Sequence, residues 1–388
     1  MIGNSEKVRL IRVITQSEVV PWHLKNFIDR SQNDYELYIV GNQVSRYRDD
    51  YPGVIFIDNE IARKISPIKD LVALCKLITL FIRIRPHVVH SIMPKSGFLA
   101  ALASWLTLTP VRVHTFTGQV WATKSGASRF ILMMIDKIIL KLNTRCLTDS
   151  PSQSEFLKEN GFLKNGNKIS YLGKGSLSGV SLSRFKLMEH EQKRIVRKEL
   201  GLNEDDFVYI FLARKSVVKG INQLFASFDQ ISNLPRVKLL FIGPDESDGA
   251  LSILNSKYKH LLSKIISLDI VKEHERYLAI SDVLCLPSSS EGFGTIVIEA
   301  SAMNVPSIGF DIVGLSDAIE SNKTGILVPF PNVDKFADAM KDLYENEERL
   351  EQMRLNGRNR VLEYFSADAI YKFQKEFYKI LLDDKLKH

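Results

Sequence analysis

Short apolar, β-branched runs alternate with longer segments of helical periodicity along almost the whole chain. In the first half the strand-like runs lie at 8–14, 36–41, 54–57, 88–92, 111–116 and 145–148, with helix-like segments at 68–81, 96–105 and 128–142. Parallel strands need long crossover connections, and strands covered on both faces are continuously apolar. The pattern therefore predicts a doubly wound α/β domain.

The same alternation restarts after a stretch rich in glycine and serine at 173–182. A charged helical segment at 189–199 is followed by strand-like runs at 207–212, 237–242, 283–286, 306–310 and 325–328. We therefore predict two Rossmann-like domains, 1–178 and 179–366, that face one cleft at the carboxyl ends of their strands. The last segment, 367–388, has apolar residues at helical spacing and is predicted to pack back on the N-terminal domain.

Composition excludes several classes of protein. Hydrophobic residues at 45% and charged residues at 25% fit a folded globular chain rather than a disordered one. Three widely spaced cysteines, Cys75, Cys146 and Cys285, favour neither a disulfide framework nor a metal clip. No apolar run has the length of a membrane span, and residues 1–14 lack the apolar core of a signal peptide. We therefore expect a cytoplasmic protein.

Positive charge is concentrated in the first half. Residues 1–180 hold 24 Lys and Arg against 14 Asp and Glu, whereas the rest of the chain is slightly acidic. The segment 124–145 has an amphipathic pattern in which Phe130, Ile131, Met134, Ile138 and Leu142 alternate with Arg129, Lys137 and Lys141. It fits a contact with an anionic membrane surface, or a helix that faces the core with a solvated basic side.

The most informative motif runs from Leu286 to Ala300. A strand ends at Pro287, a loop with two glycines follows, and a helix is predicted to begin at Thr295. Glycine permits close backbone approach, and the free N–H groups of a helix start suit a phosphate. Glu291 and Glu299 would lie at the same strand end and accept hydrogen bonds from sugar hydroxyls. Alternatively, they are a turn residue and a solvent-facing helical residue.

A second motif, Arg214-x4-Lys219-Gly220, follows the first strand of the second domain. A guanidinium and an ammonium at one strand end suit a diphosphate. Surface solvation is the alternative reading of this segment by itself.

These motifs, together with Gly243-Pro244-Asp245 and Lys323 to Pro329, resemble retaining glycosyltransferases of family 4, whose fold is GT-B. The resemblance implies that domain 179–366 binds a nucleotide-sugar donor and domain 1–178 the acceptor. It further implies the donor-binding set Arg214, Lys219, Glu291, Gly292, Phe293, Gly294, Thr295 and Glu299. Arg214 and Lys219 would hold the diphosphate, Glu299 the ribose hydroxyls and Glu291 the donor sugar.

In the first domain, His114 ends a strand and precedes a glycine-containing loop with Thr117 and Gly118. The family resemblance makes His114 a cleft histidine and, with Glu291, Arg214 and Lys219, part of the catalytic set. A buried structural histidine is the alternative. His90 and Lys95, in the segment HSIMPKSG, end a neighbouring strand and are assigned with Thr117 and Gly118 to the acceptor side.

The two first-domain segments also resemble the bacterial subgroup that builds surface polysaccharide or lipid-linked glycans. The expected reaction is transfer of a sugar, an N-acetylhexosamine or a deoxy derivative, from a UDP-sugar to an undecaprenyl-diphosphate-linked saccharide at the inner face of the membrane. The UDP-sugar is a co-substrate, and we expect no cofactor and no metal, since Asp-x-Asp is absent. A GT-B sugar-nucleotide epimerase and a non-catalytic GT-B partner subunit are the alternatives. A nucleic-acid partner is not expected, because no recognition motif accompanies the basic charge.

Overall fold

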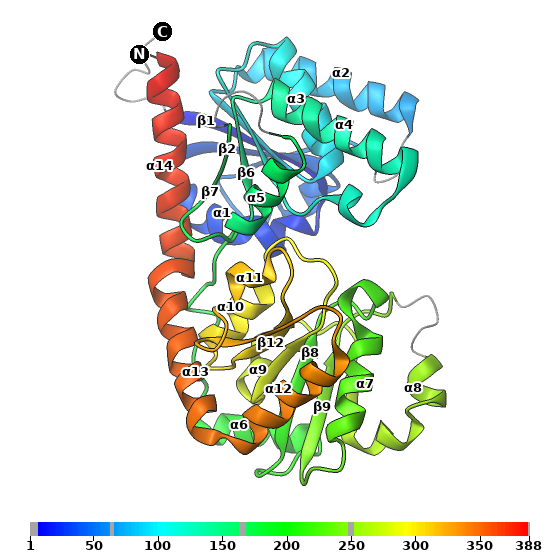
Figure 1. Ribbon diagram of the computed structural model, residues 1–388. Helices are drawn as coiled ribbons and strands as arrows, with labels where there is room; N and C mark the ends of the chain where they lie inside the picture. Colours follow the sequence, from blue (N-terminus) through cyan, green and yellow to red (C-terminus); the bar gives the residue numbers. More distant parts are fainter. Residues whose placement is uncertain (1–6, 63–65, 163–167, 247–251, 387–388) are drawn as a thin grey trace. The chain divides into compact units, whose positions relative to one another are not determined.

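The computed structural model describes residues 7–62, 66–162, 168–246 and 252–386 (Figure 1). The chain forms two compact units: unit 1 comprises 1–179 and 367–388, and unit 2 comprises 180–366. The chain therefore leaves unit 1 once, builds unit 2 without interruption, and returns to unit 1 for its last helix.

Unit 1 is built on a sheet of seven parallel strands in the order β3-β2-β1-β4-β5-β6-β7. The order reverses beside β1, which is the mark of a doubly wound sheet. The strands are β1 Val8–Gln16, β2 Tyr35–Asn42, β3 Ile55–Asp58, β4 Val88–Ile92, β5 Val111–Phe116, β6 Arg145–Thr148 and β7 Ile169–Tyr171.

Helices cover both faces of this sheet, because successive strand side chains point to opposite sides. Leu10 of β1 belongs to the apolar cluster shared with α1 and α14, whereas Ile11 packs with α2 and α3. The helices of unit 1 are α1 Lys25–Ser31, α2 Pro67–Ile84, α3 Pro94–Leu106, α4 Gly126–Leu142, α5 Pro151–Glu159 and α14 Ala367–Leu386.

The last helix, α14, is part of the core of unit 1. Tyr378 is fully buried, and its hydroxyl accepts a hydrogen bond of 2.9 Å from Arg12 Nη1 on β1. Its ring lies edge-on to Phe27 and Tyr35, with centroids 6.4 and 6.0 Å away. Burial of an aromatic side chain of this size contributes roughly 1.5 to 3 kcal/mol. The final segment of the sequence is therefore required to complete the first unit.

Unit 2 repeats the architecture with six parallel strands in the order β10-β9-β8-β11-β12-β13. The strands are β8 Phe207–Leu212, β9 Val237–Ile242, β10 Ile265–Leu268, β11 Val283–Leu286, β12 Ser307–Phe310 and β13 Gly325–Val328. The helices are α6 His190–Glu199, α7 Ile221–Ile231, α8 Ser252–Ser256, α9 His274–Ala279, α10 Thr295–Ala302, α11 Leu315–Ala318, α12 Val333–Glu345 and α13 Glu347–Arg360.

Two apolar clusters lie on the two faces of the unit 2 sheet, one packed with α7 and α12 and the other with α10. The two Rossmann-like folds predicted from the alternation are thus confirmed. Strands β7 and β10 were not predicted. Both are short edge strands, and partial exposure of their side chains removes the continuous apolar signal of a central strand.

No helix among the described residues is long and apolar enough to cross a membrane.

Candidate active site

The two motif loops of unit 2 follow adjacent strands. The Arg214 to Gly220 segment follows β8 and the Ser288 to Gly294 segment follows β11, and β8 and β11 pair directly. Between them the strand order of the sheet reverses. Ligands of open α/β sheets bind in the crevice outside the carboxyl ends of strands at such a switch point. The topology therefore brings the two predicted donor motifs to one place.

Lys219 and Glu291 form an ion pair between these loops. Lys219 Nζ lies 2.6 Å from Glu291 Oε1, and their side chains are only 16% and 10% exposed. Ser288 Oγ donates to the same carboxylate oxygen over 2.7 Å. Such a shielded pair holds both side chains in fixed positions, and an anion that entered here would meet an ordered ammonium group.

Glycines allow the loops to approach this closely. Gly220 has φ 79°, and a Cβ there would lie 1.8 Å from the carbonyl oxygen of Pro287. Gly314, with φ 90°, has its Cβ position 2.5 Å from the carbonyl oxygen of Gly292. Both positions combine a left-handed backbone with no room for a side chain. The site is therefore assembled by backbone contacts that only glycine permits.

Arg214 is half-exposed and pairs with Glu246, Nη1 to Oε2, over 2.6 Å. Its neighbour Lys215 is buried and has a structural role: its Nζ donates to the Leu268 carbonyl over 2.8 Å and lies 4.8 Å from the centre of the Phe241 ring. The structure thus gives these two adjacent cations different roles. Arg214 can exchange its carboxylate partner for a ligand, whereas Lys215 fastens β8 to β10.

The helix α10 begins directly after the second motif loop. Gly294 precedes it with φ 83°, and no side chain caps its first N–H groups. These groups have no partner within the helix and carry partial positive charge, so they suit a phosphate oxygen. Thr295 is the first helical residue. The ring of Phe293 is buried against Phe365, with centroids 5.4 Å apart, so only its backbone is available to a ligand.

Glu299 on α10 is bonded to His274 at the start of α9, where His274 Nε2 lies 3.0 Å from Glu299 Oε2. The other ring nitrogen, Nδ1, lies 3.1 Å from Arg184 Nη2. Sequence reasoning missed His274 and Arg184, because neither belongs to a motif and only packing brings them to α10. This chain of contacts orients the Glu299 carboxylate.

Replacing Glu299 by alanine is expected to weaken UDP binding by about 10- to 100-fold, since a charge-assisted hydrogen bond contributes roughly 1.5 to 3 kcal/mol. His274→Ala, which removes only the orienting ring, should have a smaller effect. Titration of UDP by calorimetry measures both, with Glu345→Ala on α12 as the control. Wild-type UDP affinity in Glu299→Ala would remove Glu299 from the ribose role.

In unit 1, His114 lies near the carboxyl end of β5 and is buried. Its Nδ1 is 3.0 Å from Ser91 Oγ, and its ring lies against Gly97 of α3, where a Cβ would be 2.3 Å from the imidazole. Burial lowers the pKa of His114 to about 3, so the ring is neutral at physiological pH. A neutral imidazole can still accept or donate a hydrogen bond.

His90 does not share the surroundings of His114. In the register of β4 and β5, His114 pairs with Ser91 and His90 pairs with Val113, so the two rings point to opposite faces of the sheet. His90 is fully buried, with Nδ1 on the Tyr378 hydroxyl and Nε2 on Thr115 Oγ1 over 2.7 Å. Both ring nitrogens are occupied within the core, and His90 joins α14 to the sheet. Its assignment to the acceptor side stays a prediction.

Lys95 opens α3 and pairs with Asp70 of α2, Nζ to Oδ1, over 2.7 Å. Thr117 and Gly118 follow β5 and are half-buried, and Gly118 has φ 98°. The end of their loop is fixed by Trp121, whose buried indole donates to Asp136 over 2.8 Å. The acceptor role of these three residues stays a prediction.

A buried carboxyl group that the sequence did not indicate follows β6. Asp149 is only 7% exposed, and its Oδ1 has no hydrogen-bond partner among the described residues. Burial raises the pKa of Asp149 to about 8, so the group is largely protonated at neutral pH. Asp149 therefore adds a protonated acid to the strand ends of unit 1.

The described residues contain no group of three or more His, Cys, Asp or Glu side chains that could hold a metal ion.

Comparison with known proteins agrees with the fold and the motif positions. Residues 192–360 match the family model of glycosyl transferases group 1, and residues 30–167 match that of the glycosyl transferase 4-like domain. The chain is 30% identical to the capsular polysaccharide biosynthesis glycosyltransferase CapM of Staphylococcus aureus, over 97% of this chain and 98% of CapM.

Two further similarities are informative. The UDP-Gal:alpha-D-GlcNAc-diphosphoundecaprenol alpha-1,3-galactosyltransferase of Escherichia coli is 26% identical over 82% of each chain. The crystal structure of Anabaena Alr3699/HepE in complex with UDP superposes with a TM-score of 0.78 at 15% identity, covering 96% of this chain and all of that one.

Two Rossmann-like units, together with the two family-model matches, define a glycosyltransferase of the GT-B fold. Within that class, the chain belongs to family 4 of the glycosyltransferases.

Proposed function

We propose that this enzyme transfers a sugar, an N-acetylhexosamine or a deoxy derivative, from a UDP-sugar to an undecaprenyl-diphosphate-linked saccharide, with retention at the anomeric carbon. The observation that carries the proposal is the identity with CapM over nearly the whole of both chains. The E. coli relative, which is named for a UDP-sugar and a diphosphoundecaprenol acceptor, supports the donor and acceptor classes. The product would serve bacterial polysaccharide or glycan synthesis.

The site has the groups that departure of a nucleoside diphosphate needs. The bond from the anomeric carbon to the diphosphate oxygen breaks, and negative charge develops on that oxygen. Lys219, Arg214 and the start of α10 supply positive charge at the switch point. Stabilisation that grows as charge develops lowers the barrier.

The acceptor hydroxyl oxygen forms the new bond to the anomeric carbon, and its proton passes to the departing diphosphate. Attack occurs on the face from which UDP leaves, so the configuration is retained. We assign no protein nucleophile to this step. Glu291, held by Lys219 and Ser288, would orient the donor sugar.

The experiment that tests the function is a UDP-release assay with a panel of UDP-sugars, with and without an undecaprenyl-diphosphate-linked saccharide. Acceptor-dependent UDP release and a lipid-linked product of increased mass are expected. UDP-hexoses belong in the panel, because the E. coli relative is named for UDP-Gal. Interconversion of free sugar nucleotides without an acceptor would instead indicate an epimerase.

We expect activity to be independent of divalent metal. The two cations and the helix start can neutralise the diphosphate, a task that Mg²⁺ or Mn²⁺ performs in metal-dependent transferases. In the UDP-release assay, turnover with excess EDTA should equal turnover with added Mn²⁺. Loss of activity in EDTA with rescue by Mn²⁺ would contradict this expectation.

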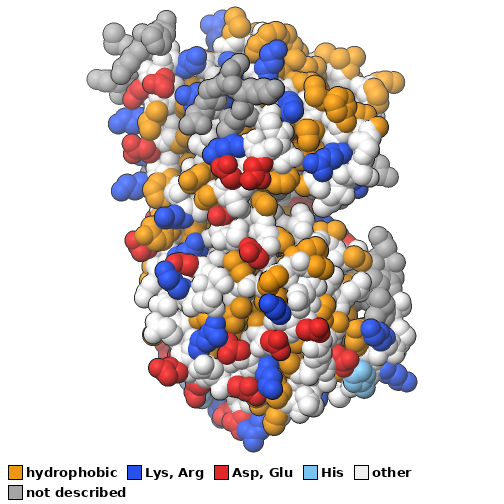
Figure 2. Space-filling view, in the orientation of Figure 1, with side chains coloured by type: hydrophobic (Ala, Val, Ile, Leu, Met, Phe, Trp, Pro, Cys, Tyr) orange, Lys and Arg blue, Asp and Glu red, His pale blue; other side chains and the backbone are white. Residues whose placement is uncertain are grey.

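We also propose that unit 1 docks on the anionic inner face of the cell membrane through α4. Four of its five apolar residues predicted for this contact are on the exposed side: Phe130 is 65% exposed, Ile131 57%, Met134 41% and Ile138 39%. Hydrophobic side chains gather over the α2 to α4 region in Figure 2. Basic residues between these apolar positions suit anionic headgroups.

Binding to anionic vesicles is expected to fall steeply with salt, because each basic residue near the bilayer contributes roughly 1 kcal/mol that ions screen. Lys137→Glu/Lys141→Glu should weaken vesicle binding on the order of tenfold or more without changing UDP affinity. Co-sedimentation measures binding, and Lys335→Glu/Lys341→Glu on α12 of unit 2 is the matched control. Equal binding to neutral and anionic vesicles would defeat electrostatic docking.

A further inference from the structure

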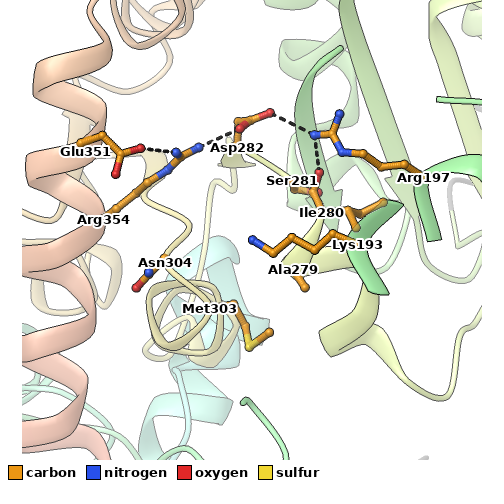
Figure 3. Close-up of a pocket in the computed structure, with 10 residues that line it drawn as sticks. All are labelled: Lys193, Arg197, Ala279, Ile280, Ser281, Asp282, Met303, Asn304, Glu351 and Arg354. Carbon is orange, nitrogen blue, oxygen red and sulfur yellow. Dashed lines mark hydrogen bonds and ion pairs between the residues drawn. The ribbon is translucent and has the colours of Figure 1, made fainter. Parts of the chain in front are cut away.

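A polar pocket lies in unit 2 at the opposite end of the sheet from the predicted donor motifs. It is lined by α6, α13, the turn before β11 and the residues that follow α10 (Figure 3). Asp282 immediately precedes β11, whereas the Glu291 loop follows that strand. The pocket is therefore a separate site and shares no lining residue with the donor motifs.

Three cationic side chains meet in this pocket with two carboxylates. Lys193 and Arg197 come from one face of α6, and Arg354 comes from α13. Both carboxylates form ion pairs with arginine. Glu351 pairs with Arg354, and the Asp282 carboxylate lies 2.7 Å from Arg354 Nη2 and 3.7 Å from Arg197 Nη2. Asp282 also accepts the Val208 N–H over 2.8 Å. The pocket therefore has one positive charge in excess.

That excess resides on Lys193. Its side chain is half-buried, and its ammonium has no hydrogen bond or ion pair with any residue in the described ranges. Burial, followed by the charge of Arg354, lowers the pKa of Lys193. A half-buried ammonium beside other cations is unfavourable unless an anion accompanies it. Figure 3 shows Lys193 extending into the pocket from α6.

Other polar groups of the pocket also lack partners. Arg354 Nε and Asn304 Oδ1 are both buried without a hydrogen bond in the described part of the chain. The Asn304 amide can turn to present its NH₂ group instead, since nothing fixes its orientation. A small ligand that accepts hydrogen bonds would satisfy these donors together with Lys193.

We propose that this pocket binds a small oxyanion of phosphate size, either free phosphate or the phosphate group of a metabolite, with Lys193 as its main ligand. The cavity volume of about 200 Å³ is below the usual range for larger organic ligands, roughly 300 to 1,000 Å³. Arg197 is held by backbone carbonyls, including Ile280 over 2.9 Å, and so contributes charge rather than contacts.

Thermal unfolding in phosphate and in chloride of equal ionic strength tests the proposal. The variant is Lys193→Met, which keeps the aliphatic stem, and the control is Lys198→Met, an exposed lysine on the same helix outside the pocket. Phosphate that binds at Arg214 and Lys219 affects all three proteins equally, so the difference between the two variants reports on this pocket alone.

Wild type and Lys198→Met should show the same saturable rise in Tm with phosphate. Lys193→Met should lose the pocket contribution, with the apparent phosphate affinity on the order of tenfold weaker or more. Without phosphate it should be at least as stable as wild type, because an unpaired charge is removed. An unchanged phosphate response in Lys193→Met, or none in wild type, would overturn the proposal.

The position of the anion can be measured in crystals soaked with selenate. Anomalous scattering within hydrogen-bond distance of Lys193 Nζ supports the site. Selenate bound only beside Lys219, or nowhere in unit 2, counts against it. A soak with glucose 6-phosphate distinguishes a phosphorylated metabolite from free phosphate as the ligand.

Discussion

Lys219→Ala is expected to lower kcat by on the order of 10²-fold or more while the fold stays intact. The ammonium lies 2.6 Å from Glu291 and is largely shielded from solvent, so water cannot replace the charge. Loss of a charge-assisted partner of the leaving group costs about 2 to 4 kcal/mol in the transition state. Steady-state kinetics of UDP release measure the effect, and circular dichroism verifies the fold.

Because Lys219 should act more strongly on the transition state than on the bound donor, kcat should fall further than KM rises. Lys335→Ala, at an exposed position of α12, is the control and should keep wild-type kinetics. Near wild-type turnover of a folded Lys219→Ala protein would show that this cation does not assist the leaving group.

Gly220→Ala is expected to have the second large effect, on both stability and activity. A Cβ at this position would lie 1.8 Å from the Pro287 carbonyl oxygen, so one of the two motif loops must move. Together with the strain of a left-handed alanine, the cost should be about 3 kcal/mol or more. Displacement of the adjacent Lys219 by about 1 Å would reduce kcat roughly 10²-fold.

Gly201→Ala is a matched control for this substitution. Gly201 has φ 69°, close to that of Gly220, but a Cβ there meets no atom within 4 Å. Gly201→Ala should lose only the stability that corresponds to the strain of a left-handed alanine, about 1 to 2 kcal/mol, and should keep full activity. Differential scanning calorimetry and UDP release measure the pair. Equal losses of stability in the two variants, with activity preserved, would mean that the approach of the two loops is not required.

The central strands and the crossover helices could be predicted from sequence because buried parallel strands are continuously apolar. The edge strands β7 and β10 could not, since half of their neighbours are missing and their side chains are partly exposed. The helical periodicity of the segment 128–142 correctly predicted a helix, but the pattern did not decide which side of that helix faces the core. The structure places Ile139 and Leu140 inside and Phe130 outside.

The candidate site likewise contains residues that the sequence motifs predicted and residues that they did not. The motifs placed Arg214, Lys219 and Glu291 together because their loops follow adjacent strands, but Glu246 and His274 come from elsewhere in the sequence and carry no motif. The sequence also did not show that the rings of His90 and His114 point to opposite faces of the sheet, which follows from the register of β4 and β5. Which strands pair, and in which register, cannot be deduced from a single segment.

The return of the chain to unit 1 has a consequence for protein synthesis. Residues 180–366 leave the ribosome before α14 does. The complete sequence of unit 2 is therefore available while unit 1 still lacks Tyr378 and the other core residues of its last helix. Until then, the apolar face of β1 and β4 that α14 covers is open to water or to chaperones. Unit 1 can therefore be completed only after α14 has been synthesised, and a chain that stops before 367 leaves unit 1 unfinished while unit 2 can fold.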